Sequence, residues 1–263
     1  MKNSIIYVMV FLGLQAAASL IVTALWGLLG GTPDLTVVKM IVITALFSVA
    51  VIAVFLLARW AELSPHWLRT RPWMVLFWSV VAAFGTMLPS VWLQELLPEM
   101  PNIVEDELKM ILGNRWGYLA VGLLAPLAEE IVFRGAILRT LLGNDSPTST
   151  GYRPMVAIAL SAVFFAVAHL NPVQMPHAFL IGLLLGWMYW RTGSILPGLA
   201  FHWANNSVAY VCYNLFPSQE DMTMSEFFGG SQTHVAMALF CSLLILLPAL
   251  FQLNVWMKKT GDR

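Results

Sequence analysis

The stretch WGYLAVGLLAPLAEEIVFRGAILRTLL, residues 116–142, is apolar along almost its whole length but carries Glu129, Glu130 and Arg134 in its middle. In a helix Glu129 lies about 20 Å from Trp116 and about 15 Å from Arg139, so both ends of the stretch are distant from the two glutamates. Each charge at the centre of a membrane helix costs about 2.5–3.5 kcal/mol on insertion scales. Such residues normally form pairs, line a polar cavity and carry function. We therefore predict a membrane helix with a functional site at its centre.

The composition around this stretch also indicates a membrane protein. Of the 263 residues, 59% are hydrophobic and 11% are charged, and the mean hydropathy is +0.76. Soluble domains carry about 45–50% apolar and about 25% charged residues. A chain this apolar cannot cover a globule with polar surface, so a soluble enzyme and a disordered protein are both excluded.

The apolar windows predict an all-α, polytopic membrane protein of about eight transmembrane helices. No repeat or long linker interrupts the chain, so we expect one helical domain with three parts. These are an N-terminal part with three spans (1–115), a core with the polar motifs (116–216), and a loop with the last span (217–263). The expected spans are 5–29, 37–58, 73–94, 116–142, 154–170, 176–190, 197–216 and 234–256.

The distribution of lysine and arginine predicts the orientation of these spans. Only Lys39, Lys109 and Arg115 fall on the side opposite the N-terminus. With the N-terminus inside, the basic residues on the cytoplasmic side are Lys2, Arg59, Arg69, Arg71, Arg139, Arg153, Arg191, Lys258, Lys259 and Arg263. We therefore expect both termini to be cytoplasmic.

Charge and cysteine content exclude other partners and frameworks. Fourteen basic and fourteen acidic residues cancel, so we expect no nucleic-acid partner. Cys212 and Cys241 both lie in apolar runs, where we expect buried, small hydrophobic residues rather than a disulfide or a zinc framework.

Helix geometry separates the roles of the three central charges. Glu130 and Arg134 are spaced i, i+4 and can form an intrahelical pair. Glu129 lies about 100° around the helix and lacks that partner. A buried carboxylate beside a histidine or an arginine can accept a proton from water near neutral pH. The alternative is a structural ion pair that braces helix contacts.

Two later spans add further polar groups. His169 lies near the end of the fifth span; taken alone, it is more typical of a hydrogen-bonded packing residue. His202 and Asn206 share one face of the seventh span, and two donors aimed at one point can hold an oxyanion. Imidazole and carboxylate groups also suit zinc, but the chain has no H-E-x-x-H helix.

Three motifs in these spans resemble those of the CAAX-protease and bacteriocin-processing (CPBP, or Abi) intramembrane proteases. EEIVFR (residues 129–134) resembles the first motif, FAVAH (165–169) the second and HWANN (202–206) the third. The segment RTGSILPGLAFH, which leads into the third motif, is also similar. The resemblance extends over about residues 116 to 210, and no motif position departs from the pattern.

The resemblance implies a membrane-embedded endopeptidase of eight helices with assigned site residues. By analogy, Glu129 and His169 activate the attacking water, Glu130 and Arg134 position the site, and His202 with Asn206 stabilises the oxyanion. The role of His169 rests on the resemblance alone. No cofactor is expected; a divalent metal such as zinc is the competing account, with Glu129, His169 and His202 as candidate ligands.

One geometric problem accompanies this site. In straight helices, His169 lies about 24 Å from Arg153, whereas His202 is only about eleven residues from Arg191. The two histidines meet only if GSILPG (Gly193 to Gly198) enters the membrane as a re-entrant turn. Such backbone must be buried in protein or line a water-filled cavity.

The leading functional hypothesis is an intramembrane endopeptidase that acts on a membrane-anchored peptide or protein, in a bacterial cell membrane. The second is a non-catalytic membrane interaction or regulatory protein of the same fold. A third, an ion-coupled transporter, follows from the intramembrane Glu, His and Arg residues. Internal inverted repeats are common in transporters, and we detect none in this chain.

Overall fold

The computed structural model describes residues 1–31, 36–63, 67, 72–143, 151–216 and 222–261, with side chains up to residue 257 at the C-terminal end. The regular structure of these residues is entirely helical. The long elements are α1 (Lys2–Leu28), α2 (Val37–Leu57), α3 (Trp73–Glu95), α7 (Pro154–Ala168), α8 (Met175–Thr192), α9 (Leu196–Leu215) and α11 (Gln232–Gly261). The central helix is built from four consecutive segments: η2 (Tyr118–Leu124), α5 (Ala125–Glu130), η3 (Ile131–Leu138) and α6 (Arg139–Leu141).

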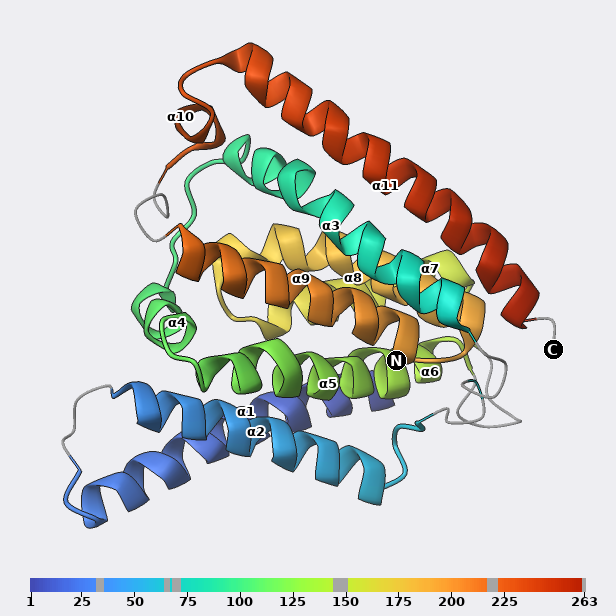
Figure 1. The fold of residues 1–263 in the computed structure, drawn as a ribbon. Coiled ribbons are helices and arrows are strands. Elements are labelled where there is room, and N and C mark those ends of the chain that lie inside the picture. Colours follow the sequence, from blue (N-terminus) through green and yellow to red (C-terminus); the bar gives the residue numbers. More distant parts are fainter. Residues whose placement is uncertain (32–35, 64–66, 68–71, 144–150, 217–221, 262–263) are drawn as a thin grey trace.

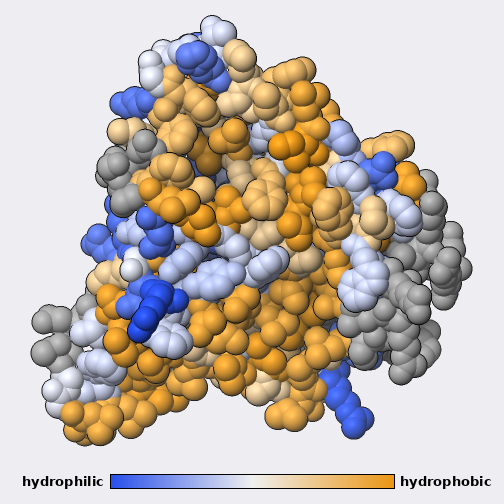
Figure 2. All heavy atoms as spheres, in the orientation of Figure 1, coloured by the Kyte–Doolittle hydropathy of each residue, from blue (hydrophilic) through white to orange (hydrophobic). Residues whose placement is uncertain are grey.

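These elements lie at all eight predicted spans, and the chain is an all-α, polytopic integral membrane protein. Four helices, α1, α2, α3 and the apolar part of α11, are long and apolar enough to cross a bilayer. Large hydrophobic side chains on them are exposed, among them Leu20, Val49, Phe77 and Phe251. Figure 2 shows that hydrophobic residues cover most of one face, with strongly hydrophilic residues at its margins and a band of weakly hydrophilic residues across its middle. The exposed apolar surface is what a lipid environment requires.

The central helix lies between two groups of helices (Figure 1). The α1–α2 hairpin packs on one side of it, while α7, α8 and α9 pack on the other. Helices α3 and α11 pack against each other and lie beyond α8 and α9. Every residue of η3 is buried. The stretch with the central charges is therefore the core of the bundle.

Two short helices at one end of the bundle were not predicted, because their periodicity is too brief to detect. Helix α4 (Glu105–Leu112) has three acidic residues in its first turn, where their negative charges interact favourably with the positive end of the helix dipole. Helix α10 (Met224–Phe227) starts with a capping box between Thr223 and Glu226. These hydrogen bonds from Thr223 hold the pKa of Glu226 below its ordinary value.

The two ends of the chain lie at the same end of the bundle, opposite α4 and α10 (Figure 1). This agrees with an even number of spans. Several basic residues used to predict the orientation lie outside the described part of the chain, namely Arg69, Arg71 and Arg263, as do the side chains of Lys258 and Lys259.

The prediction that both cysteines are buried was wrong. Cys212 and Cys241 are free thiols, as predicted, but both are exposed rather than buried. Each lies on the outer face of its helix, where a bilayer accepts a small apolar side chain as readily as a protein core does.

Candidate functional site

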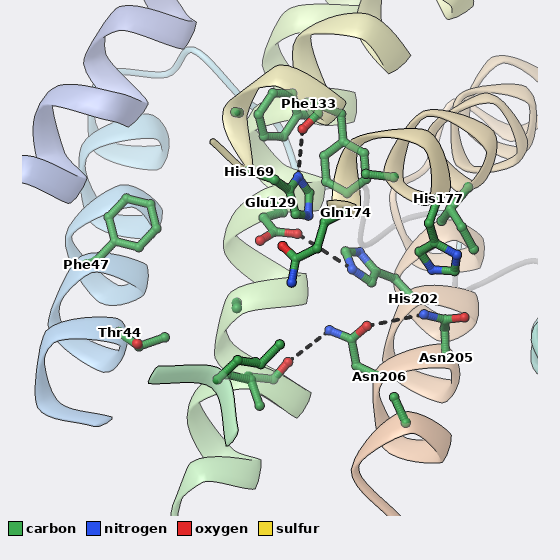
Figure 3. Close-up of a pocket in the computed structure, with 18 of the residues that line it drawn as sticks. Thr44, Phe47, Glu129, Phe133, His169, Gln174, His177, His202, Asn205 and Asn206 are labelled. Atoms are coloured by element: carbon green, nitrogen blue, oxygen red, sulfur yellow. Dashed lines mark hydrogen bonds and ion pairs between the residues drawn. The ribbon is translucent and has the colours of Figure 1, made fainter. Parts of the chain in front are cut away.

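A cavity of about 420 Å³ lies beside the central helix, and Figure 3 shows its polar groups. Helices α1, α2 and α4 and the central helix contribute mainly apolar side chains to it. The part of the chain from α7 to α9 contributes most of the polar ones. The polar and ionisable lining residues are Gln15, Thr44, Glu129, His169, Gln174, His177, His202, Asn205 and Asn206.

Local irregularity of the central helix prepares one side of this cavity. The N–H of Ala125 donates to the oxygen of Ala120, five residues back, in a π-helical turn. The corresponding donor for the carbonyl of Val121 would be residue 126, which is a proline and has no N–H. Nδ2 of Asn206 donates to this carbonyl instead, at 3.0 Å. Pro126 thereby leaves a backbone acceptor that holds the side chain of Asn206.

Glu130 and Arg134 form the predicted intrahelical pair. Nη1 of Arg134 donates to Oε1 of Glu130 at 2.8 Å, and neither side chain has any exposed surface. Nη2 of Arg134 donates to the carbonyl of Gly182 on α8 at 3.3 Å. The guanidinium also lies 4.5 Å from the ring centroid of Phe165 on α7. The pair therefore joins the central helix to both α7 and α8.

His202 lies between the two glutamates of the central helix. Its Nδ1 donates to Oε1 of Glu130 at 3.2 Å, and its Nε2 lies 3.6 Å from Oε2 of Glu129. The side chain of Glu129 is 20% exposed, whereas that of Glu130 is fully buried. Glu129 is thus the carboxylate open to the cavity, and His202 connects it to the buried pair.

Phe165 brings the two site histidines together. Nδ1 of His169 donates to the carbonyl of Phe165 at 2.8 Å. The rings of His169 and His202 both pack edge-to-face against Phe165, with centroid separations of 4.8 and 5.8 Å. The first residue of the FxxxH motif therefore contacts Arg134 and both histidines.

The structure brings together the residues predicted from the sequence. Glu129, His169, His202 and Asn206 all line the cavity (Figure 3). Glu130 and Arg134 lie buried behind them. The ion-pair contact of Glu129 is with His202 rather than with His169. His202 is held between the carboxylates of Glu129 and Glu130.

The turn before α9 explains how His169 and His202 meet. Ser194 and Ile195 are buried, with 0% and 2% of their surface exposed. A Cβ on Gly135 of the central helix would lie 3.7 Å from the Ile195 side chain, so this turn packs against the core. Within Gly193 to Gly198, Ser194, Ile195, Pro197 and Gly198 are buried, whereas Gly193 is exposed. The entry of this segment into the membrane stays a prediction.

Sequence reasoning missed several residues of the cavity wall. His177 was given no chemistry, yet it lines the cavity from the first turn of α8, and its Nδ1 bonds the Ser90 hydroxyl of α3. Asn205 was not among the predicted site residues, yet it lines the cavity and its Nδ2 donates to Oδ1 of Asn206 at 3.4 Å. Gln15 was overlooked in the apolar first span. Each is a polar residue in an apolar stretch, which was the only available signal.

The zinc alternative stays a prediction, for which the described residues present no ready ligand set. No group of three or more histidine, cysteine, aspartate or glutamate side chains within the described ranges is arranged to hold a metal ion. The expected ligands Glu129, His169 and His202 share a cavity. Nδ1 of His202 is already bonded to Glu130, and its Nε2 lies 3.6 Å from Oε2 of Glu129. We derive no step through a metal.

Comparison with known proteins identifies the segment that carries this site. Residues 112–208 match the family model of the type II CAAX prenyl endopeptidases, described as Rce1-like. The matched segment contains all three motifs. The comparisons with curated proteins and with solved structures gave no match.

Proposed function

From the match to Rce1-like CAAX prenyl endopeptidases, we propose that this chain is an intramembrane endopeptidase acting on a membrane-anchored, prenylated peptide or protein. The main support for the proposal is the set of polar side chains that meet in one cavity. Glu129, the more exposed of two adjacent intramembrane carboxylates, shares this cavity with His169, His202 and Asn206. Intramembrane ionisable groups in such a cavity are typical of function.

Glu129 is proposed as the general base. A water molecule beside its carboxylate transfers a proton to Glu129 as the water oxygen attacks the scissile carbonyl carbon. Collapse of the tetrahedral intermediate breaks the C–N bond, and the proton passes from Glu129 to the leaving amine. General acid–base catalysis of this kind contributes about 10²–10⁴-fold in rate.

The tautomer of His169 supports a role beside Glu129. A carbonyl oxygen can only accept, so Nδ1 of His169 carries the proton in its bond to Phe165. In the neutral ring, Nε2 then has a free lone pair. His169 is therefore prepared to accept a hydrogen bond from the attacking water.

His202 and Asn206 are proposed to hold the oxyanion. Nδ1 of His202 donates to the carboxylate of Glu130, so its Nε2 becomes a donor only in the imidazolium form. Glu129 and Glu130 flank the ring. Their two negative charges would balance the positive charges of Arg134 and of an imidazolium at His202, so the four side chains together would carry no net charge. Asn206 spends one N–H on Val121 and retains a second for the oxyanion.

Glu130 and Arg134 are proposed as positioning residues. Both are fully buried, so neither reaches the attacking water. Glu130 orients His202 through Nδ1, and Arg134 balances the charge of Glu130 while anchoring α8. Groups fixed in this way incur little reorganisation during the reaction.

The proposal is tested with Glu129→Gln, which keeps the shape of the side chain and removes the base. Wild type and the variant are expressed at matched levels in the native host, and membrane and secreted peptides are compared by mass spectrometry. We expect a precursor to accumulate only in the variant, with about a 10²–10⁴-fold loss of cleavage of that precursor. Glu99→Gln, at an exposed position outside the cavity, is the matched control. Identical peptide profiles for Glu129→Gln and wild type would contradict the proposal.

A further inference from the structure

Two polar side chains lie on the wall opposite the motif residues, in helices that the family match does not include. Gln15 on α1 and Thr44 on α2 both line the cavity. Their neighbours on this wall are apolar, among them Phe11, Ile43 and Phe47. Figure 3 shows Thr44 on α2 facing Asn206 across the cavity.

Aromatic contacts place Gln15 and Thr44 at a similar height in the bundle. The ring of Phe11 lies 4.9 Å from that of Phe47 and 5.2 Å from that of Phe133. Helix α1 runs opposite to α2 and to the central helix (Figure 1). Gln15 follows Phe11 by four residues and Thr44 precedes Phe47 by three, so both lie about one turn from this contact in the same direction.

Glu129 lies on the same side of the aromatic contact, because it precedes Phe133 by four residues in a helix parallel to α2. The proposed base and the pair formed by Gln15 and Thr44 therefore occupy one section of the cavity. Gln15 adds a second observation: its Oε1 is buried and has no hydrogen-bond partner among the described residues. A buried acceptor of this kind is available to a donor that the described residues do not supply, such as a bound molecule in the cavity.

We propose that Gln15 and Thr44 form a subsite for the peptide backbone of an extended substrate. This inference rests on the proposed function, since it assumes that a peptide enters the cavity. A segment that presents a scissile bond cannot keep its helical hydrogen bonds, and inside a membrane its freed N–H and C=O groups need partners. The carboxamide of Gln15 accepts from one N–H, and the hydroxyl of Thr44 donates to a neighbouring carbonyl.

A binding measurement tests this subsite separately from catalysis. The full chain carrying Glu129→Gln, which prevents turnover, is placed in lipid nanodiscs. The probe is a fluorescent, farnesylated CAAX peptide, together with analogues in which one backbone N–H at a time is replaced by an ester oxygen. Binding is followed by fluorescence anisotropy, with empty nanodiscs subtracted.

We expect one ester analogue to bind about 3- to 10-fold more weakly than the parent peptide, as for the loss of one hydrogen bond. Adding Gln15→Leu weakens binding of the parent peptide to a similar extent and abolishes discrimination against that analogue. Thr44→Val likewise weakens binding. Ser19→Leu and Thr23→Val, at exposed positions on α1, are the matched controls and leave the pattern unchanged.

Two results overturn the subsite. One is unchanged discrimination in the Gln15→Leu protein, and the other is no measurable binding of the probe. Cleavage of the same peptide by the chain with Glu129 intact separates this inference from the proposed function. Discrimination that depends on Gln15 without cleavage would refute the protease, whereas cleavage without any effect of Gln15 would refute the subsite.

Discussion

Arg134 and Arg139 are both paired with a glutamate, but only the Arg134 pair is fully buried. Arg134 and Glu130 have no exposed side-chain surface. Arg139 bonds Glu62 at 2.6 Å, and the Glu62 side chain is 67% exposed. Removing one partner of a buried pair strands a charge, whereas an exposed pair contributes little. The two arginines therefore form a matched test of what burial does.

We expect Arg134→Met to lower the free energy of unfolding by about 3–5 kcal/mol, because it removes the arginine partner of Glu130 inside the bundle and leaves only the hydrogen bond from His202. Arg139→Met should lower it by less than about 1 kcal/mol. Tryptophan fluorescence during denaturant unfolding in detergent micelles measures both. Equal losses for the two variants would contradict the role of the buried pair.

At the scale of the element, Pro126 leaves one backbone carbonyl of the central helix without a helical donor. Because residue 126 has no N–H, the Val121 carbonyl is left to accept from Asn206. In Pro126→Ala, the restored N–H competes with Asn206 for that carbonyl. We expect kcat/KM to fall about 3- to 10-fold, as for the loss of one positioning hydrogen bond, without loss of thermal stability.

Pro248→Ala is the control for this prediction, because Pro248 also lies inside a long helix but belongs to α11, outside the cavity. Its kcat/KM should equal that of wild type. Thermal unfolding and cleavage assays on the same preparations separate activity from folding. Unchanged activity in Pro126→Ala would show that Asn206 does not need the Val121 carbonyl.

At the scale of the whole molecule, the two chain ends lie at one end of the bundle (Figure 1). The excess of lysine and arginine on that side leads us to propose that both ends are cytoplasmic. Reporter domains that are active only in the cytoplasm should then give a signal when fused to either end. The same reporter inserted in the segment between α3 and α4 should give none. Opposite signals from the two ends would contradict an even number of spans.

Much of the site could be predicted because charge inside an apolar helix is costly. Glu129, Glu130 and Arg134 were conspicuous for this reason, and their i, i+4 spacing sufficed to predict the Glu130–Arg134 pair. The contact between Glu129 and His202 was not predictable in the same way. It joins residues far apart in the chain, and its existence depends on the buried turn before α9.

Local information in this sequence determined the membrane class, the positions of the eight apolar helices and the identity of the central charged helix. These features follow from hydropathy and helical spacing, which act between residues near one another in the chain. Tertiary packing decided what the cavity contains. It placed Gln15 and Thr44 opposite the motif residues and set His202 between two carboxylates. Which helices meet, and at what height, depends on side-chain contacts such as Phe11 with Phe47 and Phe133, and no single helix encodes them.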